Sequence, residues 1–85
     1  MSEQEPIAIV KHFFDKISVA ILKINKGCEL KVGDTILFKG KETDFEQNVD
    51  SMQLFKEPIE VATEDQEIGL KTSEKVKEGD EVFLK

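Results

Sequence analysis

The stretch LKVGDTILFK, residues 30–39, is nearly repeated as VKEGDEVFLK at residues 76–85. In each copy an apolar residue is followed, after two intervening residues, by Gly-Asp and then by an alternating apolar run. Glycine can adopt a positive φ without steric penalty, and an aspartate at a turn accepts hydrogen bonds from nearby backbone amides. Each copy is therefore predicted to form a turn that starts a strand, with turn residues that are structural rather than catalytic: Gly33, Asp34, Gly79 and Asp80.

The chain length of 85 residues fits one domain over residues 1–85, and the polar residues 1–5 are expected to form a flexible N-terminus. No window approaches the ~20 apolar residues that span a bilayer, and the acidic opening differs from a signal peptide. Cys28 is the only cysteine, so no intrachain disulfide can form. These features predict a cytoplasmic protein without a membrane partner.

The charges are unevenly distributed along the chain. Residues 1–41 carry seven lysines and five acids, whereas residues 42–85 carry five lysines and thirteen acids, for a net charge of −6. All twelve basic residues are lysines, so the chain lacks the planar guanidinium group that reads guanine or binds phosphate with two parallel bonds. Trp and Tyr are absent, and no glycine-rich phosphate-binding motif occurs. We therefore expect neither DNA nor nucleotide as a partner.

Strand signals dominate the sequence. Gly40 ends one predicted strand, Gly69 lies inside another, and Pro58 to Ala62 is expected to be a turn or a single helical turn. The longest segment changes its apolar phase, which predicts a β-bulge near Asp50-Ser51. Short strands without a periodic helix predict an all-β fold, a small six-stranded antiparallel β-barrel, because closure removes exposed sheet edges. The six predicted strands lie within residues 7–14, 19–24, 35–39, 43–55, 68–70 and 82–84.

Residues suited to catalysis are scarce. His12 and Cys28 are the only histidine and cysteine, and no third partner is implied for them, so each is interpreted as an ordinary packed or surface residue. Paired carboxylates such as Asp44/Glu46 are common, but most fall in predicted turns, where water solvates them and no burial would raise a pKa. A filled barrel also has no cleft for a hydrolytic pair. The sequence predicts no catalytic residue, metal or cofactor, and therefore no enzyme.

Several motifs occur in an order known from one module. After Leu30-x-x-Gly33-Asp34 come Val49-x-x-Met52-x-x-Phe55, Ala62, Ile68-Gly69-Leu70 and Gly79-Asp80-x-Val82. With these motifs, which extend roughly from Ile9 to Leu84, the chain resembles domain 2 of translational GTPases such as elongation factor Tu and initiation factor two. A similar barrel closes the collagenase-like peptidases. The GTPase domain has no counterpart in this sequence, so GTP hydrolysis is not implied.

The resemblance also implies candidate binding residues. In elongation factor Tu, the strand matching Met52 to Lys56 helps to hold the aminoacylated end of transfer RNA through an acidic and a basic residue. Gln53 and Lys56 stand at those two positions, and a reading of both as solvent-facing strand residues remains open. Asp65 stands where the family usually has glycine, and aspartate tolerates the left-handed conformation better than most residues.

Two functions are compatible with these observations. The leading hypothesis is a non-catalytic binding module associated with translation, with RNA or a ribosome-linked partner, and with Lys11, Lys16, Lys39 and Lys41 gathered on one face. The alternative is a protein-interaction module or an accessory subunit of an enzyme such as a collagenase-like peptidase. The alternative needs exposed apolar anchors. Its candidates are residues that we first expect in the core: Phe13, Phe14, Phe55 and Phe83.

Overall fold

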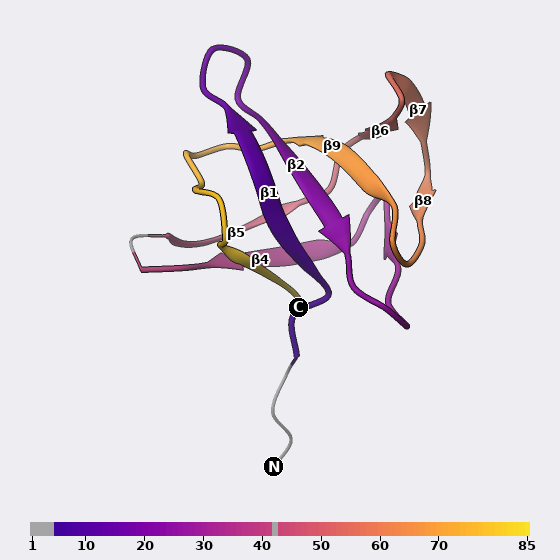
Figure 1. Cartoon of the computed structure of the whole chain (residues 1–85), viewed down its shortest axis with the longest axis horizontal. Coiled ribbons are helices and arrows are strands. Elements are labelled where there is room, and N and C mark those ends of the chain that lie inside the picture. Colours follow the sequence, from indigo (N-terminus) through magenta and orange to yellow (C-terminus); the bar gives the residue numbers. More distant parts are fainter. Residues whose placement is uncertain (1–4, 42) are drawn as a thin grey trace.

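The computed structural model describes residues 5–41 and 43–85, and the regular elements in them are all β-strands (Figure 1). The all-β prediction is confirmed. Of the expected flexible N-terminus, residues 1–5, only Glu5 lies within the described residues. In chain order the strands are β1 (Ala8–Phe14), β2 (Val19–Ile24), β3 (Leu30–Lys31), β4 (Thr35–Lys39), β5 (Asp44–Asn48), β6 (Met52–Leu54), β7 (Glu57–Ile59), β8 (Val61–Ala62), β9 (Glu67–Lys71) and β10 (Glu81–Leu84).

Eight strands form one antiparallel sheet in the order β5-β4-β10-β1-β2-β9-β6-β7, and β3 pairs with β8 in a separate ribbon. The sheet curls, so that β4 and β5 run across the direction of β1 and β2 in Figure 1. The Gln47 side chain links the outer strand β5 to the segment after β9. Its Nε2 donates to the Lys71 carbonyl at 3.0 Å, and its Oε1 accepts from the Ser73 amide at 2.8 Å. Strand β5 ends the sheet, and the Gln47 side chain attaches this edge to the end of β9 and to the segment that follows it.

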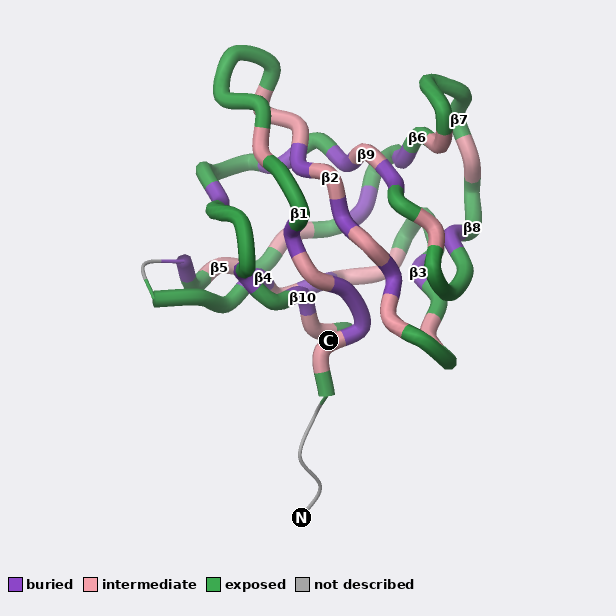
Figure 2. The backbone as a smooth tube through the Cα atoms, in the orientation of Figure 1, coloured by how far each residue is buried: buried purple, intermediate pink, exposed green. Residues whose placement is uncertain are grey.

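The inward positions of the strands form the core. Along β2, the side chains of Ala20, Leu22 and Ile24 are fully buried and alternate with half-buried residues, as the sequence predicts. Figure 2 shows the same alternation of buried and more exposed positions along β9. Burying a large aliphatic or aromatic side chain stabilises a fold by ~1.5–3 kcal/mol. The largest fully buried side chains are Phe38, Leu22, Ile24, Leu30, Ile36, Met52, Ile68, Leu70, Val10, Val49 and Val82.

The repeated phrase forms the same turn twice. Gly33 and Gly79 have φ values of +100° and +91°. The carboxylates of Asp34 and Asp80 each accept a hydrogen bond from the backbone amide three residues earlier, at 2.9 and 2.8 Å. The amide of each turn aspartate donates to the carbonyl of that same earlier residue, at 3.0 Å in both copies. Each phrase thus reverses the chain and starts a strand, β4 in the first copy and β10 in the second.

The two copies are related by a local twofold axis. β4 and β10 pair antiparallel with Leu37 opposite Phe83, and these two residues hold equivalent places in the repeated phrase. The amide of each turn glycine donates to a valine carbonyl at 2.8 Å, Val49 for the first copy and Val10 for the second. The repeat therefore builds two adjacent strands of the sheet, β4 and β10, in the same way.

One turn of the repeat is buried against Gly40. Asp80 is 6% exposed, and its carboxylate also accepts the Thr43 hydroxyl at 2.5 Å. A Cβ atom at Gly40 would overlap the Asp80 carboxylate, so only glycine permits this close approach. Gly40 is therefore a packing requirement as well as the end of β4.

Two local predictions are wrong. The expected continuous strand over residues 43–55 divides into β5, which pairs with β4, and β6, which pairs with β9. The apolar phase changes at Asp50-Ser51 because the chain leaves one part of the sheet for another, and not because of a β-bulge. Pro58 to Ala62, expected as a turn, forms β7 and β8; proline is tolerated in β7 because that strand ends the sheet. These changes, together with the short strand β3, which was not predicted, raise the count from the predicted six to ten strands in the described residues. The eight-stranded sheet is open and curled, with β5 and β7 at its two ends, and is not the predicted six-stranded barrel.

Candidate functional site

The hairpin that joins β6 and β7 carries the most exposed large apolar side chain of the described residues. Leu54 pairs with Glu57, so Phe55 and Lys56 alone form the turn. Both have positive φ, 53° and 67°, as in a type I′ turn, for which Asn-Gly is the favoured pair. A left-handed conformation costs ~1–2 kcal/mol in an ordinary residue. The Phe55 side chain is nevertheless 89% exposed, so burial does not offset this strain.

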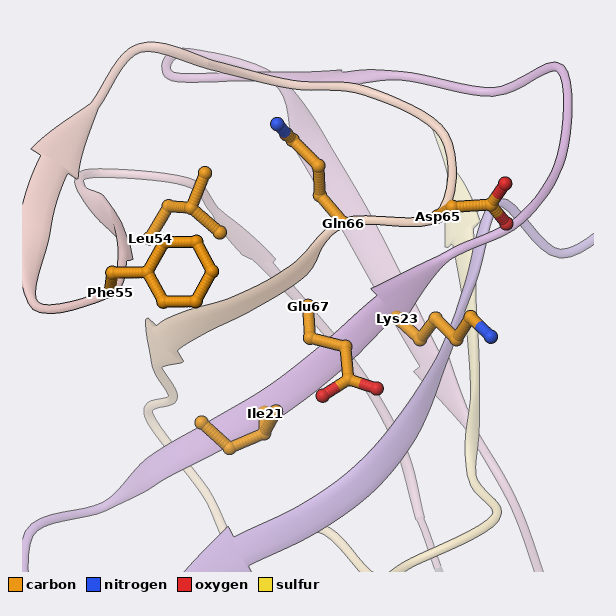
Figure 3. A pocket seen from close by; sticks show the side chains of 7 residues that line it. All are labelled: Ile21, Lys23, Leu54, Phe55, Asp65, Gln66 and Glu67. Atoms are coloured by element: carbon orange, nitrogen blue, oxygen red, sulfur yellow. The ribbon is translucent and has the colours of Figure 1, made fainter.

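A hollow of about 570 Å³ lies beside the hairpin. Figure 3 shows the Leu54 and Phe55 side chains together at one side, Ile21 of β2 below them, and Glu67 between this apolar group and Lys23. The turn before β9 completes the wall. The residues that line the hollow are Ile21, Lys23, Leu54, Phe55, Asp65, Gln66 and Glu67.

The turn before β9 is held by hydrogen bonds to the end of β2 and within the turn itself. Asp65 has φ 66°, the left-handed conformation that the sequence predicts for it. The amide of Asp65 donates to the Ile24 carbonyl at 2.8 Å. The Gln66 Oε1 accepts from the Thr63 amide at 2.9 Å. These hydrogen bonds fix the wall of the hollow, and the Asp65 carboxylate takes part in neither of them.

A second hollow lies farther along the outer side of the same strands. Gly69 faces outward between the buried residues Ile68 and Leu70, and it pairs with Gln53 of β6 and Ile21 of β2. The nearest atoms to a Cβ at Gly69 would be 3.6–3.9 Å away, so the outer face is open there because the side chain is missing. Val19, Ser51, Met52, Gln53, Gly69 and Lys71 line this second hollow, of about 170 Å³.

Negative charge predominates around the first hollow. Asp65, Glu67 and Glu57 of β7 are exposed, and none of them is in a salt bridge with the described residues. Lys23 lines the hollow and Lys56 lies in the hairpin turn. Two carboxylates and one ammonium group thus line the hollow beside its apolar residues, while Glu57 and Lys56 lie in the adjoining hairpin. Such a site suits a ligand in which an apolar group lies next to a positively charged group.

The sequence-predicted binding residues fall into two groups. Gln53 is exposed on β6 and lines the second hollow, and Lys56 is exposed in the adjoining hairpin. Lys41 is exposed beside the turn of Gly79 and Asp80. Lys39, at the end of β4, is flanked by register with Glu81 and Asp44. The structure therefore brings Gln53 and Lys56 to the candidate site and leaves Lys39 and Lys41 elsewhere.

The remaining lysines proposed for a basic face lie on other elements. Lys11 is exposed on β1, beside a register irregularity between Val10 and His12, and Lys16 is exposed in the loop before β2. In the sheet, β10 separates β1, which carries Lys11, from β4, which carries Lys39. Glu81 and Asp44 flank Lys39, so the surface around Lys39 carries charges of both signs.

The predicted core position of the phenylalanines is wrong for two of them. Phe55 is 89% and Phe14 43% exposed, whereas Phe13 and Phe83 are half-buried. Only Phe38 is fully buried. Phe55 is exposed because it lies in the two-residue turn between β6 and β7. The sequence does not show this turn, because it is defined only by the pairing of β6 with β7.

Groups with catalytic potential lie apart from one another. His12 is exposed, with its Nδ1 2.8 Å from the Glu78 carboxylate and its ring against Phe14. Cys28 is half-buried in the loop after β2. The described part of the chain has no group of three or more potential metal ligands, and no helix that is long and apolar enough to cross a membrane.

The chain is similar in sequence to a segment of a protease and in fold to a domain of a second protein. No protein-family model matches it. It is 42% identical over 79 residues to an uncharacterized protease of Methanocaldococcus jannaschii; the match covers 92% of this chain and 19% of that protein's length. Two crystal structures of the C-terminal domain of a Geobacillus thermoleovorans protein assigned to the U32 peptidases share the fold. Their TM-scores are 0.86 and 0.88 at 16% and 15% identity, with 94% and 95% of this chain and 99% and 92% of theirs covered.

Proposed function

We propose that the chain is a non-catalytic, single-domain accessory module of a peptidase, which acts by binding through the outer face near the β6–β7 hairpin. The observation that carries this proposal is the 42% identity to a segment of a much longer protease. The fold likeness to a C-terminal domain from a second peptidase supports it. Among the described residues, His12 pairs with an exposed carboxylate, and no group of three or more potential metal ligands is present.

The site chemistry supports a binding role. Phe55 is exposed in a strained turn, and strained residues that contribute little to burial cluster at functional sites. Large aromatic side chains also contribute most strongly to protein interfaces. The excess of acids after residue 42 suits a partner with a basic surface.

The translation hypothesis has weaker support. The protein and the two solved structures described above are a protease and domains assigned to a peptidase family. Lys39 and Lys41 lie apart from the Gln53 and Lys56 pair, and acidic residues flank Lys39. Binding to RNA relies on grouped cations, so this arrangement disfavours it.

Affinity purification of the tagged chain from its own cells tests the proposal. One half of the lysate is treated with nuclease, and bound proteins are identified by mass spectrometry. We expect a peptidase chain to remain after nuclease treatment, and gelatin hydrolysis to follow the complex and not the purified module. Loss of every partner with nuclease, or hydrolysis by the module alone, would contradict the proposal. The Phe55→Ala variant should retain less peptidase, whereas Ile17→Ala, on another exposed hairpin, should retain it fully.

A further inference from the structure

The two hollows of the candidate site follow one another along the outer side of β9, and together they are called the groove. Residues that point outward from β9 alternate along the strand: Glu67 lines the first hollow, and Gly69 and Lys71 line the second. Successive outward positions are roughly 6.6–6.8 Å apart, so the groove extends for about 13 Å, the length of about four residues of extended chain. Gly69 keeps it open, because a side chain there would stand between the two halves.

We infer that this groove binds an extended polypeptide segment of a partner protein, with an apolar side chain seated against Phe55 and basic residues beside it. This inference rests on the proposed function only in sharing its site. The floor of the first hollow is apolar, formed by Ile21, Leu54 and the Phe55 ring (Figure 3). An aromatic or long aliphatic side chain would cover that floor and bury the ring that the free protein leaves exposed.

The acidic residues around the first hollow indicate the charge of the polypeptide segment that would bind there. Asp65 and Glu67 line the first hollow, and Glu57 lies beside the Phe55 turn; none is paired within the described residues. A lysine or arginine one or two positions from the apolar residue would reach these carboxylates. Lys71, at the far end of the groove, suits an uncharged or acidic continuation. The groove therefore favours one direction of the bound segment.

Nucleic acid is a poorer fit to the same groove. An exposed phenylalanine can stack on a base, but the phosphates that accompany each base would lie near the unpaired carboxylates of the rim. The segment that supplies most of the site, residues 42–85, carries thirteen acids and five lysines. The charge of the site thus selects a peptide over a single-stranded nucleic acid.

The test uses a phage-displayed library of random dodecapeptides, selected on the immobilised intact chain. We expect enrichment of peptides with an aromatic or long aliphatic residue flanked by lysine or arginine. The most enriched sequence is then synthesised with a fluorescent label, and its affinity is measured by fluorescence anisotropy. The same label on a uridine homopolymer RNA tests the competing ligand.

Three variants of the chain locate the binding. Phe55→Ala should weaken the peptide roughly tenfold or more, because it removes the central anchor. Gly69→Val should have a comparable effect: its Cβ fits at ordinary contact distance and valine is favoured in strands, so the fold is kept while the groove is blocked. Ile17→Ala should leave binding unchanged. An amide NMR spectrum of each variant checks folding.

The results separate the inference from the proposed function. Enriched peptides without a basic-apolar pattern, binding that Gly69→Val leaves intact in a folded variant, or tighter binding of the RNA than of the peptide would each overturn the inference. Basic-apolar peptides that depend on Phe55 and Gly69 would support it even if no peptidase is retained from lysate. Conversely, a retained peptidase that ignores both substitutions would support the accessory role, contradict its assignment to the face near the β6–β7 hairpin, and overturn the groove.

Discussion

The strained turn at Phe55 and Lys56 predicts that the hairpin can be stabilised by a substitution that removes its binding surface. Changing both residues, Phe55→Asn with Lys56→Gly, gives the pair that a type I′ turn favours. Relief of two left-handed residues is worth ~1–2 kcal/mol each. Against this gain, the ring is 89% exposed, so its loss removes only about 20 Å² of buried area, or ~0.5 kcal/mol.

The added glycine lowers the expected gain further. Its extra freedom in the unfolded chain costs about 0.5–1 kcal/mol. The net expectation is a stabilisation of about 0.5–3 kcal/mol. With a urea m-value of ~1 kcal/mol/M for a domain of this size, the midpoint of urea unfolding should rise by roughly 0.5–3 M. Circular dichroism across a urea series measures this shift.

The control is Ile17→Asn, a similar loss of exposed apolar surface, 59% exposed, without a positive φ to relieve. Ile17 buries a larger share of its side chain than Phe55 does, so by the same area rule we expect the control to lower stability by about 1–2 kcal/mol and never to raise it. A double variant at positions 55 and 56 that is less stable than the natural chain would refute the reasoning, since Phe55 would then support the fold. A stabilised variant that no longer binds would show that this hairpin sacrifices stability for contact.

Further predictions concern the repeated turn and the core. Gly40→Ala should destabilise by about 2–4 kcal/mol, because its Cβ overlaps a buried carboxylate, whereas Gly33→Ala, in open space at φ +100°, should cost only ~1–2 kcal/mol. Asp80→Ala should cost about 2–3 kcal/mol, since it leaves two donors unsatisfied in a buried turn, against about 0.5–1 kcal/mol for the more exposed Asp34→Ala. Leu22→Ala should cost about 2–5 kcal/mol. Urea unfolding measures all five variants, and equal costs within either matched pair would contradict the assigned packing.

Local chemistry made part of the fold predictable. The alternation of Ala20, Leu22 and Ile24 defines β2 because one buried face imposes a period of two. Residues 35–39 were predicted to be a strand between the repeated turn and Gly40, and β4 has those bounds. In both places the signal lies within a few neighbouring residues.

Long-range pairing decided what the sequence could not predict. Pro58 to Ala62 forms strands because β6 supplies partners for β7 and β3 supplies partners for β8. Phe55 is apolar, and apolar residues in a small domain are most often buried. Its exposure depends on a turn type that only the register of Leu54 with Glu57 fixes. The outward position of Gly69 likewise depends on its pairing across the sheet, so the groove could not be read from the sequence.

The position of β10 in the sheet affects how the chain folds as it is synthesised. Val82 pairs with Ala8 on one side and with Phe38 on the other, so the last strand in chain order lies between two strands made much earlier. Until β10 emerges from the ribosome, β1 and β4 cannot be joined, and the unpaired backbone groups at their edges stay available to other chains. Folding should therefore be completed only after release of that strand, and the nascent chain should depend on chaperones that shield unpaired strands.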